Sequence, residues 1–316
     1  MILCCGDALI DMLPVELEGG RRGFAPHAGG AVFNTAIALG RLGVETGFFN
    51  GLSTDLFGRM LTDELKASGV DSALSPRSAR PTTLAFVMLE DGHASYHFYD
   101  EGTASRILEP ADLPSLGNGV RAVFLGGISL VVEPCGSAFE NLMAREGKTR
   151  LVMIDPNIRP DFVADEAAYR ARLTRMMAGA DIVKLSEEDL AWLSSDADAF
   201  IDELLAGGPS IVLVTHGARG ATGHTARGTI SVSPRPATIV DTVGAGDAFN
   251  AGFLEALEGL GRLDKAAVRT MGDGDLRLCL DRAAEVAAIA VSRPGANPPW
   301  ASDISAPAWR RVAARA

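Results

Sequence analysis

Ile239-Val-Asp-Thr-Val-Gly-Ala-Gly-Asp-Ala-Phe-Asn-Ala-Gly-Phe-Leu254 carries the strongest local signal in this chain. Two glycines around one alanine allow the backbone to turn sharply, and apolar residues then recur at helical spacing from Phe249. The pattern predicts a helix that begins at or just before Asp247. Free backbone N–H groups at a helix start, together with the positive end of the helix dipole, form an anion hole. The N–H groups expected there belong to Gly244, Ala245 and Gly246.

The carboxylate of Asp247 is expected at the edge of this anion hole. It could accept a proton from a hydroxyl group while the N–H groups take up charge on phosphoryl oxygens. A glycine turn followed by an aspartate that caps the helix would have the same residues, because Asp is a common N-cap. The residues of this segment leave both interpretations open.

Outside this segment, short apolar runs alternate with amphipathic stretches. The runs carry few charges, which is typical of parallel strands covered on both faces. The alternation predicts a doubly wound, mostly parallel α/β sheet, and we expect one domain over residues 1–316. The predicted strands are 2–5, 46–49, 122–125, 151–154, 182–185 and 211–214, and the clearest helical patterns are 34–42, 56–68, 137–145 and 167–177.

Residues 81–105 break this alternation. Two β-rich runs flank Asp91-Gly92, a dipeptide typical of hairpin turns. We interpret this region as an antiparallel flap off the main sheet, with residues 12–26 as a second lid element. An ordinary edge hairpin fits the pattern equally well. A half-apolar flap could form a homodimer with its copy or act as a monomeric lid.

Composition excludes several classes of function. The chain has 316 residues, 47% of them hydrophobic, and a formal net charge of -11, so it can bury a large core and would repel nucleic acid and anionic membranes. No uncharged apolar run reaches the ~18 residues of a membrane span, and the N-terminus has no basic leader. The four cysteines lack zinc or disulfide spacing. We expect a cytoplasmic protein with no nucleic-acid or membrane partner.

The motif Asp241-Thr-Val-Gly-Ala-Gly-Asp-Ala-Phe249 resembles the signature of the ribokinase-like (PfkB) carbohydrate kinase family. Gly6-Asp-Ala-Leu-Ile-Asp11 and His27-Ala-Gly-Gly-Ala-Val-Phe-Asn34 resemble the first signature of that family, and the resemblance covers essentially the whole chain. It implies a ribokinase-like fold with a small antiparallel β lid. It also implies ATP-dependent phosphorylation of a sugar hydroxyl with Mg²⁺, and Asp247 as the base.

The same resemblance implies a sugar-binding set. Glycines admit a ligand close to the backbone, and carboxylate and amide groups suit vicinal hydroxyls. Without the resemblance, the glycine pair would be a tight helix entry and Asn34 a polar helix residue. The predicted sugar-binding residues are Asp11, Gly29, Gly30, Asn34, Tyr99 and Asp247.

Three further segments, 154–160, 184–190 and 215–221, resemble the family's phosphate and nucleotide side, and the last of them resembles the strand and glycine loop that border the nucleotide phosphates and ribose. Ile154-Asp-Pro-Asn-Ile-Arg-Pro160 implies that Arg159 reaches the transferring phosphate or an acidic substrate group. In Lys184-Leu-Ser-Glu187 the resemblance implies that Glu187 places Mg²⁺ through water. Many relatives have Asn where Lys184 stands, so its contact with nucleotide is in doubt. The predicted nucleotide-binding residues are Lys184, Glu187, Thr215, Gly217, Gly220 and Gly246.

The end of the chain resembles a cation-binding segment. In many family members, carbonyl groups of residues matching 287–296, together with those near Asp241 and Val243, hold a monovalent cation such as K⁺. The candidates here are Asp241, Val243, Arg293 and Gly295. A helix end followed by a Pro-Gly stop explains the same residues.

The flap resembles the fructokinase branch through Phe98-Tyr-Asp-Glu-Gly-Thr-Ala104. Asp100 stands where branches acting on keto-deoxy acids have Arg, and would repel a substrate carboxylate. Fructokinase therefore leads over 2-keto-3-deoxygluconate kinase, ribokinase and nucleoside kinase. A non-catalytic sugar or nucleotide sensor would be expected to lack Asp247, and a Rossmann dehydrogenase would need a glycine fingerprint after residues 2–5.

Overall fold

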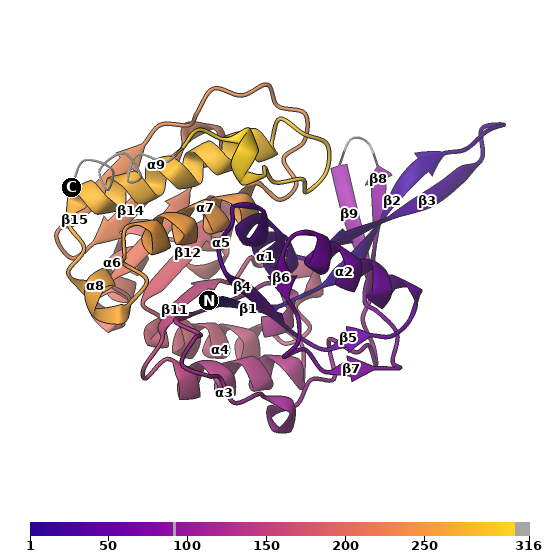
Figure 1. Cartoon of the computed structure of the whole chain (residues 1–316), viewed down its shortest axis with the longest axis horizontal. Coiled ribbons are helices and arrows are strands. Elements are labelled where there is room, and N and C mark those ends of the chain that lie inside the picture. Colours follow the sequence, from indigo (N-terminus) through magenta and orange to yellow (C-terminus); the bar gives the residue numbers. More distant parts are fainter. Residues whose placement is uncertain (91–92, 307–316) are drawn as a thin grey trace.

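The main sheet has nine strands in the computed structural model, which describes residues 1–90 and 93–306 (Figure 1). At one edge of this sheet β14 pairs antiparallel with both β13 and β15, and all other neighbouring strands are parallel. In spatial order the strands are β15 (Gly228–Val232), β14 (Ala221–Thr225), β13 (Ile211–Thr215), β12 (Ile182–Ser186), β11 (Leu151–Asp155), β10 (Ala122–Gly126), β1 (Ile2–Gly6), β4 (Thr46–Phe49) and β6 (Val70–Asp71). Each of the six predicted strands begins at the expected residue, and its last residue differs from the expected last residue by at most one position.

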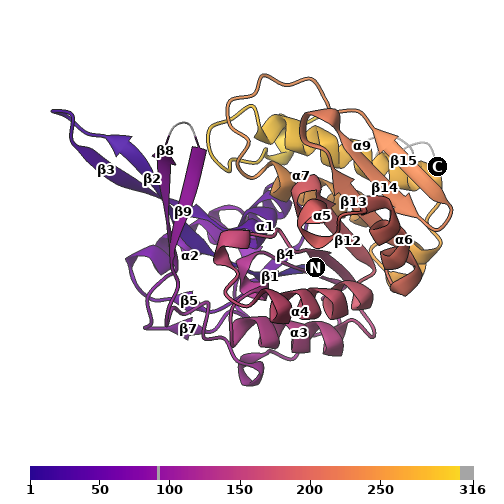
Figure 2. The same ribbon diagram turned by 180° about the vertical axis from the view of Figure 1, so that it is seen from behind.

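Helices cover both faces of this sheet, as a doubly wound fold requires. One layer contains α1 (Ala31–Arg41), α2 (Leu56–Ala67), α7 (Ala245–Gly259), α8 (Lys265–Arg269) and α9 (Asp273–Ala290). The other contains α3 (Cys135–Glu146), α4 (Glu166–Gly179), α5 (Glu187–Leu193) and α6 (Ala197–Gly207). Figures 1 and 2 show α7 and α9 on one side of the strands, and α3 and α4 on the other.

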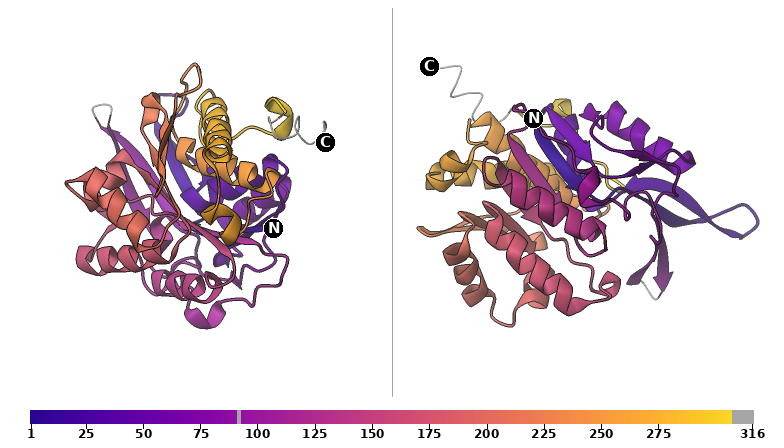
Figure 3. Two further views of the ribbon diagram at one scale, coloured as in Figure 1. Left: turned by 90° about the vertical axis from the view of Figure 1, so that its left-hand side faces the viewer. Right: turned by 90° about the horizontal axis from the view of Figure 1, so that it is seen from below.

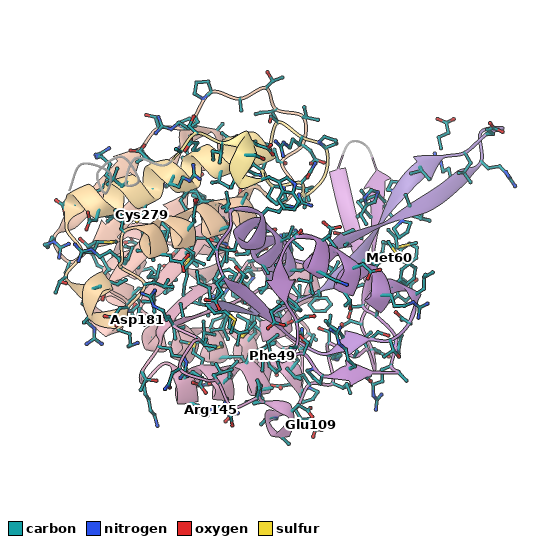
Figure 4. The ribbon with its side chains drawn as sticks, viewed as in Figure 1. Phe49, Met60, Glu109, Arg145, Asp181 and Cys279 are labelled. Atoms are coloured by element: carbon teal, nitrogen blue, oxygen red, sulfur yellow. The ribbon has the colours of Figure 1, made fainter. Side chains whose placement is uncertain are left out.

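Alternate side chains of each parallel strand enter different cores, which explains the continuous apolar runs. In β1, Ile2 and Cys4 pack under α1 and α7, whereas Leu3 and Cys5 pack towards α3. Phe49, labelled in Figure 4, lies in this second core, where its ring meets that of Phe139. Because both faces are buried, the strand has no polar side.

The lid is a separate four-stranded sheet in the order β3 (Arg22–Gly29), β2 (Leu9–Glu16), β8 (Leu84–Glu90) and β9 (His93–Tyr99). The two predicted lid elements therefore join in one sheet, and the first of them extends beyond residues 12–26 at both ends. The pair β2–β8 is parallel and the other two pairs are antiparallel. The predicted turn at Asp91-Gly92 lies outside the described residues. A small pair, β5 (Leu52–Ser53) and β7 (Arg77–Ser78), lies nearby.

The lid projects from the main body, as Figure 3 shows from below. It follows β1 directly, so it rises from the edge where the parallel strands end. In doubly wound sheets, ligands bind at this carboxyl edge. Within the described part of the chain, no helix is long and apolar enough to cross a membrane.

Candidate active site

The predicted anion hole lies at the start of α7. Gly244 adopts a left-handed conformation (φ 76°) and precedes the helix, which begins at Ala245 as the sequence predicted. The N–H of Ala245 makes a long hydrogen bond of 3.3 Å to the Thr242 carbonyl. The N–H groups of Gly244 and Gly246 have no acceptor among the described residues. These two groups and the helix dipole therefore remain available to an anion.

Asp247 is the third residue of α7 and is only 6% exposed. Its Oδ2 accepts a hydrogen bond of 2.9 Å from Nδ2 of Asn34, which lies on α1. Burial raises the pKa of Asp247 to about 7; the Asn34 hydrogen bond opposes the rise, Asp155 adds to it, and Lys184 opposes it. A carboxylate with a pKa near neutrality suits a general base.

The glycine pair at the end of β3 brings the lid and α1 close to Asp11. A Cβ atom on Gly29 would lie 2.2 Å from Oδ2 of Asp11. Gly30 has a φ of +111°, and a Cβ there would lie 2.7 Å from the Asp7 carbonyl. Burial raises the pKa of Asp11 to about 6; Asp7 adds to the rise and Arg159 opposes it. Three of the predicted sugar residues, Asp11, Gly29 and Gly30, thus lie together at the base of the lid and the start of α1.

Asp7 was not among the predicted site residues. Its Oδ1 accepts the N–H of Val32 at 3.0 Å, and its Oδ2 accepts the N–H of Ile128 at 3.4 Å. These bonds fix the start of α1, and with it Asn34, against the ends of β1 and β10. Burial raises the pKa of Asp7. A carboxylate directly after an apolar strand was the available signal.

A cavity of about 720 Å³ lies beside the anion hole. Predicted residues that line it are Arg159, Lys184, Thr215, Gly217, Gly220, Ala245 and Gly246. Apolar residues also line it, among them Pro236, Ile239, Ala284, Ala287, Ala288 and Val291. A cavity of this size that combines free N–H groups and polar side chains with an apolar lining suits a nucleotide.

Glu187 does not line this cavity. It is 41% exposed, and its Oε1 is hydrogen-bonded to Nδ1 of His216 at 2.9 Å and to Arg219. These bonds lower the pKa of Glu187. In the described ranges, no group of three or more His, Cys, Asp or Glu could hold a metal ion. The residues present fit a Mg²⁺ ion that is held mainly by phosphates and water, as Mg²⁺ commonly is.

Two residues that were not predicted for the site, Asp155 and Asn250, lie with the predicted Lys184 near the anion hole. Oδ2 of Asp155 accepts hydrogen bonds from Nζ of Lys184 at 2.9 Å and from Nδ2 of Asn250 at 2.7 Å. Burial alone would lower the pKa of Lys184, but Asp155 and Asp189 outweigh it and raise the pKa. Lys184 therefore remains a cation inside the protein.

The two predicted cation-binding loops lie side by side. Oδ2 of Asp241 accepts the N–H of Gly295 at 2.9 Å, and its Oδ1 accepts the N–H of Val243 at 3.0 Å. The carbonyl of Val291 accepts N–H groups from the first loop. The side chain of Arg293 is bonded to Asp303, so Arg293 can offer only its backbone carbonyl. Main-chain oxygens beside a carboxylate fit a hard monovalent cation.

Two lid residues behave differently from the sequence-based picture. Tyr99 is 64% exposed, and its ring contacts Phe86. Its neighbour Phe98 packs against Phe162, with ring centroids 4.7 Å apart, in a cluster that touches the main body. Asp100 is buried and accepts a hydrogen bond from Thr83. It also pairs with Arg106, so its charge is compensated within the lid base.

The doubly wound sheet, the buried Asp247 beside free backbone amides, the adjacent cavity and the lid are the features expected of a sugar kinase. The chain belongs to the pfkB family of carbohydrate kinases, whose family model matches residues 1–303. It is 50% identical to a fructokinase from Rhizobium leguminosarum bv. trifolii over 279 residues, which cover 88% of this chain and 86% of that protein. These matches confirm the family and the ribokinase-like fold that the motifs implied.

Solved structures of other fructokinases are similar to this chain as well. A fructokinase with bound ATP from Xylella fastidiosa has a TM-score of 0.86 and 32% identity over 93% of each chain. A fructokinase double mutant from Vibrio cholerae O395, in a form bound to fructose, ADP and potassium ion, has a TM-score of 0.81 and 27% identity over 93% of each chain. All three of these relatives are fructokinases.

Proposed function

We propose that this enzyme transfers the γ-phosphate of ATP to a hydroxyl group of fructose. The observation that carries the proposal is the position of Asp247. Its carboxylate is bonded to Asn34 on the sugar side, and the preceding residue, Gly246, lines the nucleotide cavity. The similarity to fructokinases, one of them 50% identical, supports fructose as the acceptor.

In the proposed reaction, the sugar hydroxyl loses its proton to Asp247 as its oxygen forms a bond to the γ-phosphorus. The bond between that phosphorus and the bridging oxygen breaks, and ADP leaves. The free N–H groups of Gly244 and Gly246 stabilise charge on the phosphoryl oxygens. Arg159 lines the cavity and also opposes the pKa rise of Asp11, so it lies between the two substrates.

Mg²⁺, when bound with ATP, would neutralise phosphate charge. We propose that Glu187 contributes through water, which would require it to loosen its bonds to His216 and Arg219. For K⁺, we propose backbone carbonyls of the two adjoining loops as ligands. The hydrogen bonds of Asp241 to Val243 and Gly295 support this, and the Vibrio cholerae relative in its potassium-bound form supports it further.

A neutral sugar suits this site better than a keto-deoxy acid. The carboxylates of Asp11 and Asp247 both belong to the sugar side, and they would repel a substrate carboxylate. Asp100 carries less of this argument than the sequence suggested, since Arg106 compensates it. We propose that Tyr99 contacts the substrate only when the lid is closed.

Two further proposals concern the whole protein. The four cysteines are free and buried, which supports a reducing compartment such as the cytoplasm. Leu17, Phe24 and Tyr99 are exposed apolar residues on the lid, which supports a homodimer through this sheet. A monomer in sedimentation equilibrium at micromolar concentration would reject the dimer.

The substrate is tested by ADP release from purified enzyme with fructose, ribose, adenosine and 2-keto-3-deoxygluconate side by side. We expect kcat/KM for fructose to exceed the others by roughly tenfold or more, which corresponds to ~1.4 kcal/mol of transition-state discrimination. A higher value for another acceptor would replace fructose. Binding without turnover on any acceptor would favour the sensor hypothesis.

A further inference from the structure

An ion pair is buried in the layer between the main sheet and α7. Lys184 and Asp155 lie on the neighbouring strands β12 and β11, and both are almost fully buried. Their strand neighbours two residues earlier, Ile182 and Met153, belong to the apolar core under α7. Charged side chains are rarely found in such a layer, because removing them from water costs more than their attraction usually returns. Stability alone is a weak reason for this pair.

The pair is held in one orientation by α7 and by the loop after β11. Oδ2 of Asp155 accepts hydrogen bonds from Nζ of Lys184 at 2.9 Å and from Nδ2 of Asn250 at 2.7 Å. Oδ1 of Asp155 accepts the N–H of Asn157 at 3.2 Å. Asn250 lies in the second turn of α7, so one helix presents the anion hole and also fixes the carboxylate that holds the ammonium.

The ammonium lies directly beside the anion hole. Lys184 and Gly246 both line the nucleotide cavity, and a Cβ atom on Gly246 would lie 3.2 Å from Nζ of Lys184. An ammonium has three N–H donors. Among the described residues one donor is used, by Asp155. The others are available to a ligand in the cavity.

We propose that Lys184 is a catalytic residue whose ammonium binds the transferring phosphoryl group beside the Gly244–Gly246 amides, with Asp155 and Asn250 as positioning residues. The inference rests on the proposed phosphotransfer. During transfer, charge spreads over the equatorial oxygens of the phosphoryl group, and a fixed cation in a buried site stabilises that charge better than water does. Many relatives have Asn at this position, and in this chain we expect Lys184 to act there as a cation and not as an amide would.

A second Lys–Asp pair provides a matched control. Nζ of Lys265 donates to Oδ2 of the buried Asp181 at 2.6 Å. Asp181 immediately precedes β12, the strand that carries Lys184, and lies beside α8 (Figure 4). Neither Lys265 nor Asp181 lines the nucleotide cavity. Removing Lys265 therefore tests the loss of a lysine that pairs with a buried aspartate, without a change at the anion hole.

The experiment compares Lys184→Met, the double variant Asp155→Asn with Lys184→Met, and the control Lys265→Met. The double variant removes both charges, so no buried carboxylate is left without a partner if the single variant unfolds. We expect kcat to fall roughly 100-fold or more in both Lys184 variants, equivalent to ~2.7 kcal/mol, with KM for ATP within about threefold. Lys265→Met should keep kcat.

Binding supplies a readout that a structural role would not change. Calorimetry should give both Lys184 variants an affinity for ADP within about threefold of the parent, but strongly reduced affinity for ADP with aluminium fluoride, which mimics the transferring phosphoryl group. A folded double variant that keeps turnover and binds the mimic normally would overturn the proposal. So would an equal loss of turnover in Lys265→Met.

Failure of this inference can be told apart from failure of the proposed function. The parent is first assayed with the sugar panel, and the best acceptor is used for all variants, so a sugar other than fructose leaves the Lys184 test intact. A parent that phosphorylates no acceptor rejects the proposed function before any variant is made.

Discussion

Ionising Asp247 in the folded enzyme costs free energy, because burial raises its pKa to about 7 from an ordinary value of 3.8. Asp247→Asn removes this cost. The asparagine keeps the shape of the side chain, and its Oδ1 can still accept the hydrogen bond from Asn34. The variant should therefore be more stable than the parent at neutral and alkaline pH, although it has lost the proposed base.

The size of the effect follows from proton linkage. Between pH 5 and pH 7 the unfolded chain is ionised at this position while the folded chain still binds the proton, so parent stability falls by ~1.4 kcal/mol per pH unit. Over these two units the loss is ~3 kcal/mol, and above pH 7 it stays constant. With an unfolding entropy of ~2.1 cal/mol/K per residue over 316 residues, this corresponds to ~4 °C in Tm.

Scanning calorimetry of the parent and Asp247→Asn from pH 5 to pH 9 measures this difference. The Tm of the variant should exceed that of the parent by a margin that grows by ~4 °C up to pH 7 and then levels off. Asp63→Asn, at an exposed position of α2, controls for the loss of a carboxylate, and kcat of Asp247→Asn should fall roughly 100-fold or more. A margin that does not change with pH would refute the assigned environment of Asp247.

Three other predictions test the site. Because Asp247, the proposed base, must be ionised, kcat/KM should fall about tenfold per pH unit below pH 7 and be level above it; a flat profile in a continuous ADP-release assay would contradict this. Gly29→Ala puts a Cβ 2.2 Å from Oδ2 of Asp11, so KM for the sugar should rise about tenfold or more while KM for ATP stays unchanged in steady-state kinetics. Replacing K⁺ with tetramethylammonium should lower kcat severalfold, and Asp241→Ala should remove the difference; equal rates in both salts would count against the cation loops.

The main strands could be predicted because their signal is local. A parallel strand that is buried on both faces is an uninterrupted apolar run, and all six predicted runs are strands. β15 (Gly228–Val232) was not predicted. Its exposed Thr229 and Ser231 alternate with buried Ile230 and Val232, which is a weaker signal at a sheet edge. The glycine loop before α7 was predictable for a similar reason. The backbone at position 244 is left-handed, a conformation that favours glycine, so the local sequence shows the turn.

Residues whose roles depend on strand order were missed. Asp155 is the last residue of an apolar strand, and Asn250 is 95 positions away in α7; only the fold brings them together. Asp7 similarly caps α1 across 25 positions. By contrast, Glu187 matched a local motif, yet its carboxylate is bonded to His216 and Arg219 instead of facing the cavity. A motif therefore identifies the residue type at a position better than it identifies the direction of the side chain.

The carboxylates and cations of this site act on one another, so Asp247 cannot be considered alone. Asp155 raises the pKa of Asp247 through its own charge, but it also holds Lys184, whose charge lowers that pKa. These two effects on Asp247 oppose each other. The pair therefore leaves the pKa of Asp247, which burial raises to about 7, near neutral pH, and it keeps a full positive charge beside the anion hole. A lone lysine in this layer would tend to lose its proton, and a lone aspartate would tend to gain one. The pair therefore keeps a cation at the phosphate end without making Asp247 too weak a base to accept the proton of the sugar.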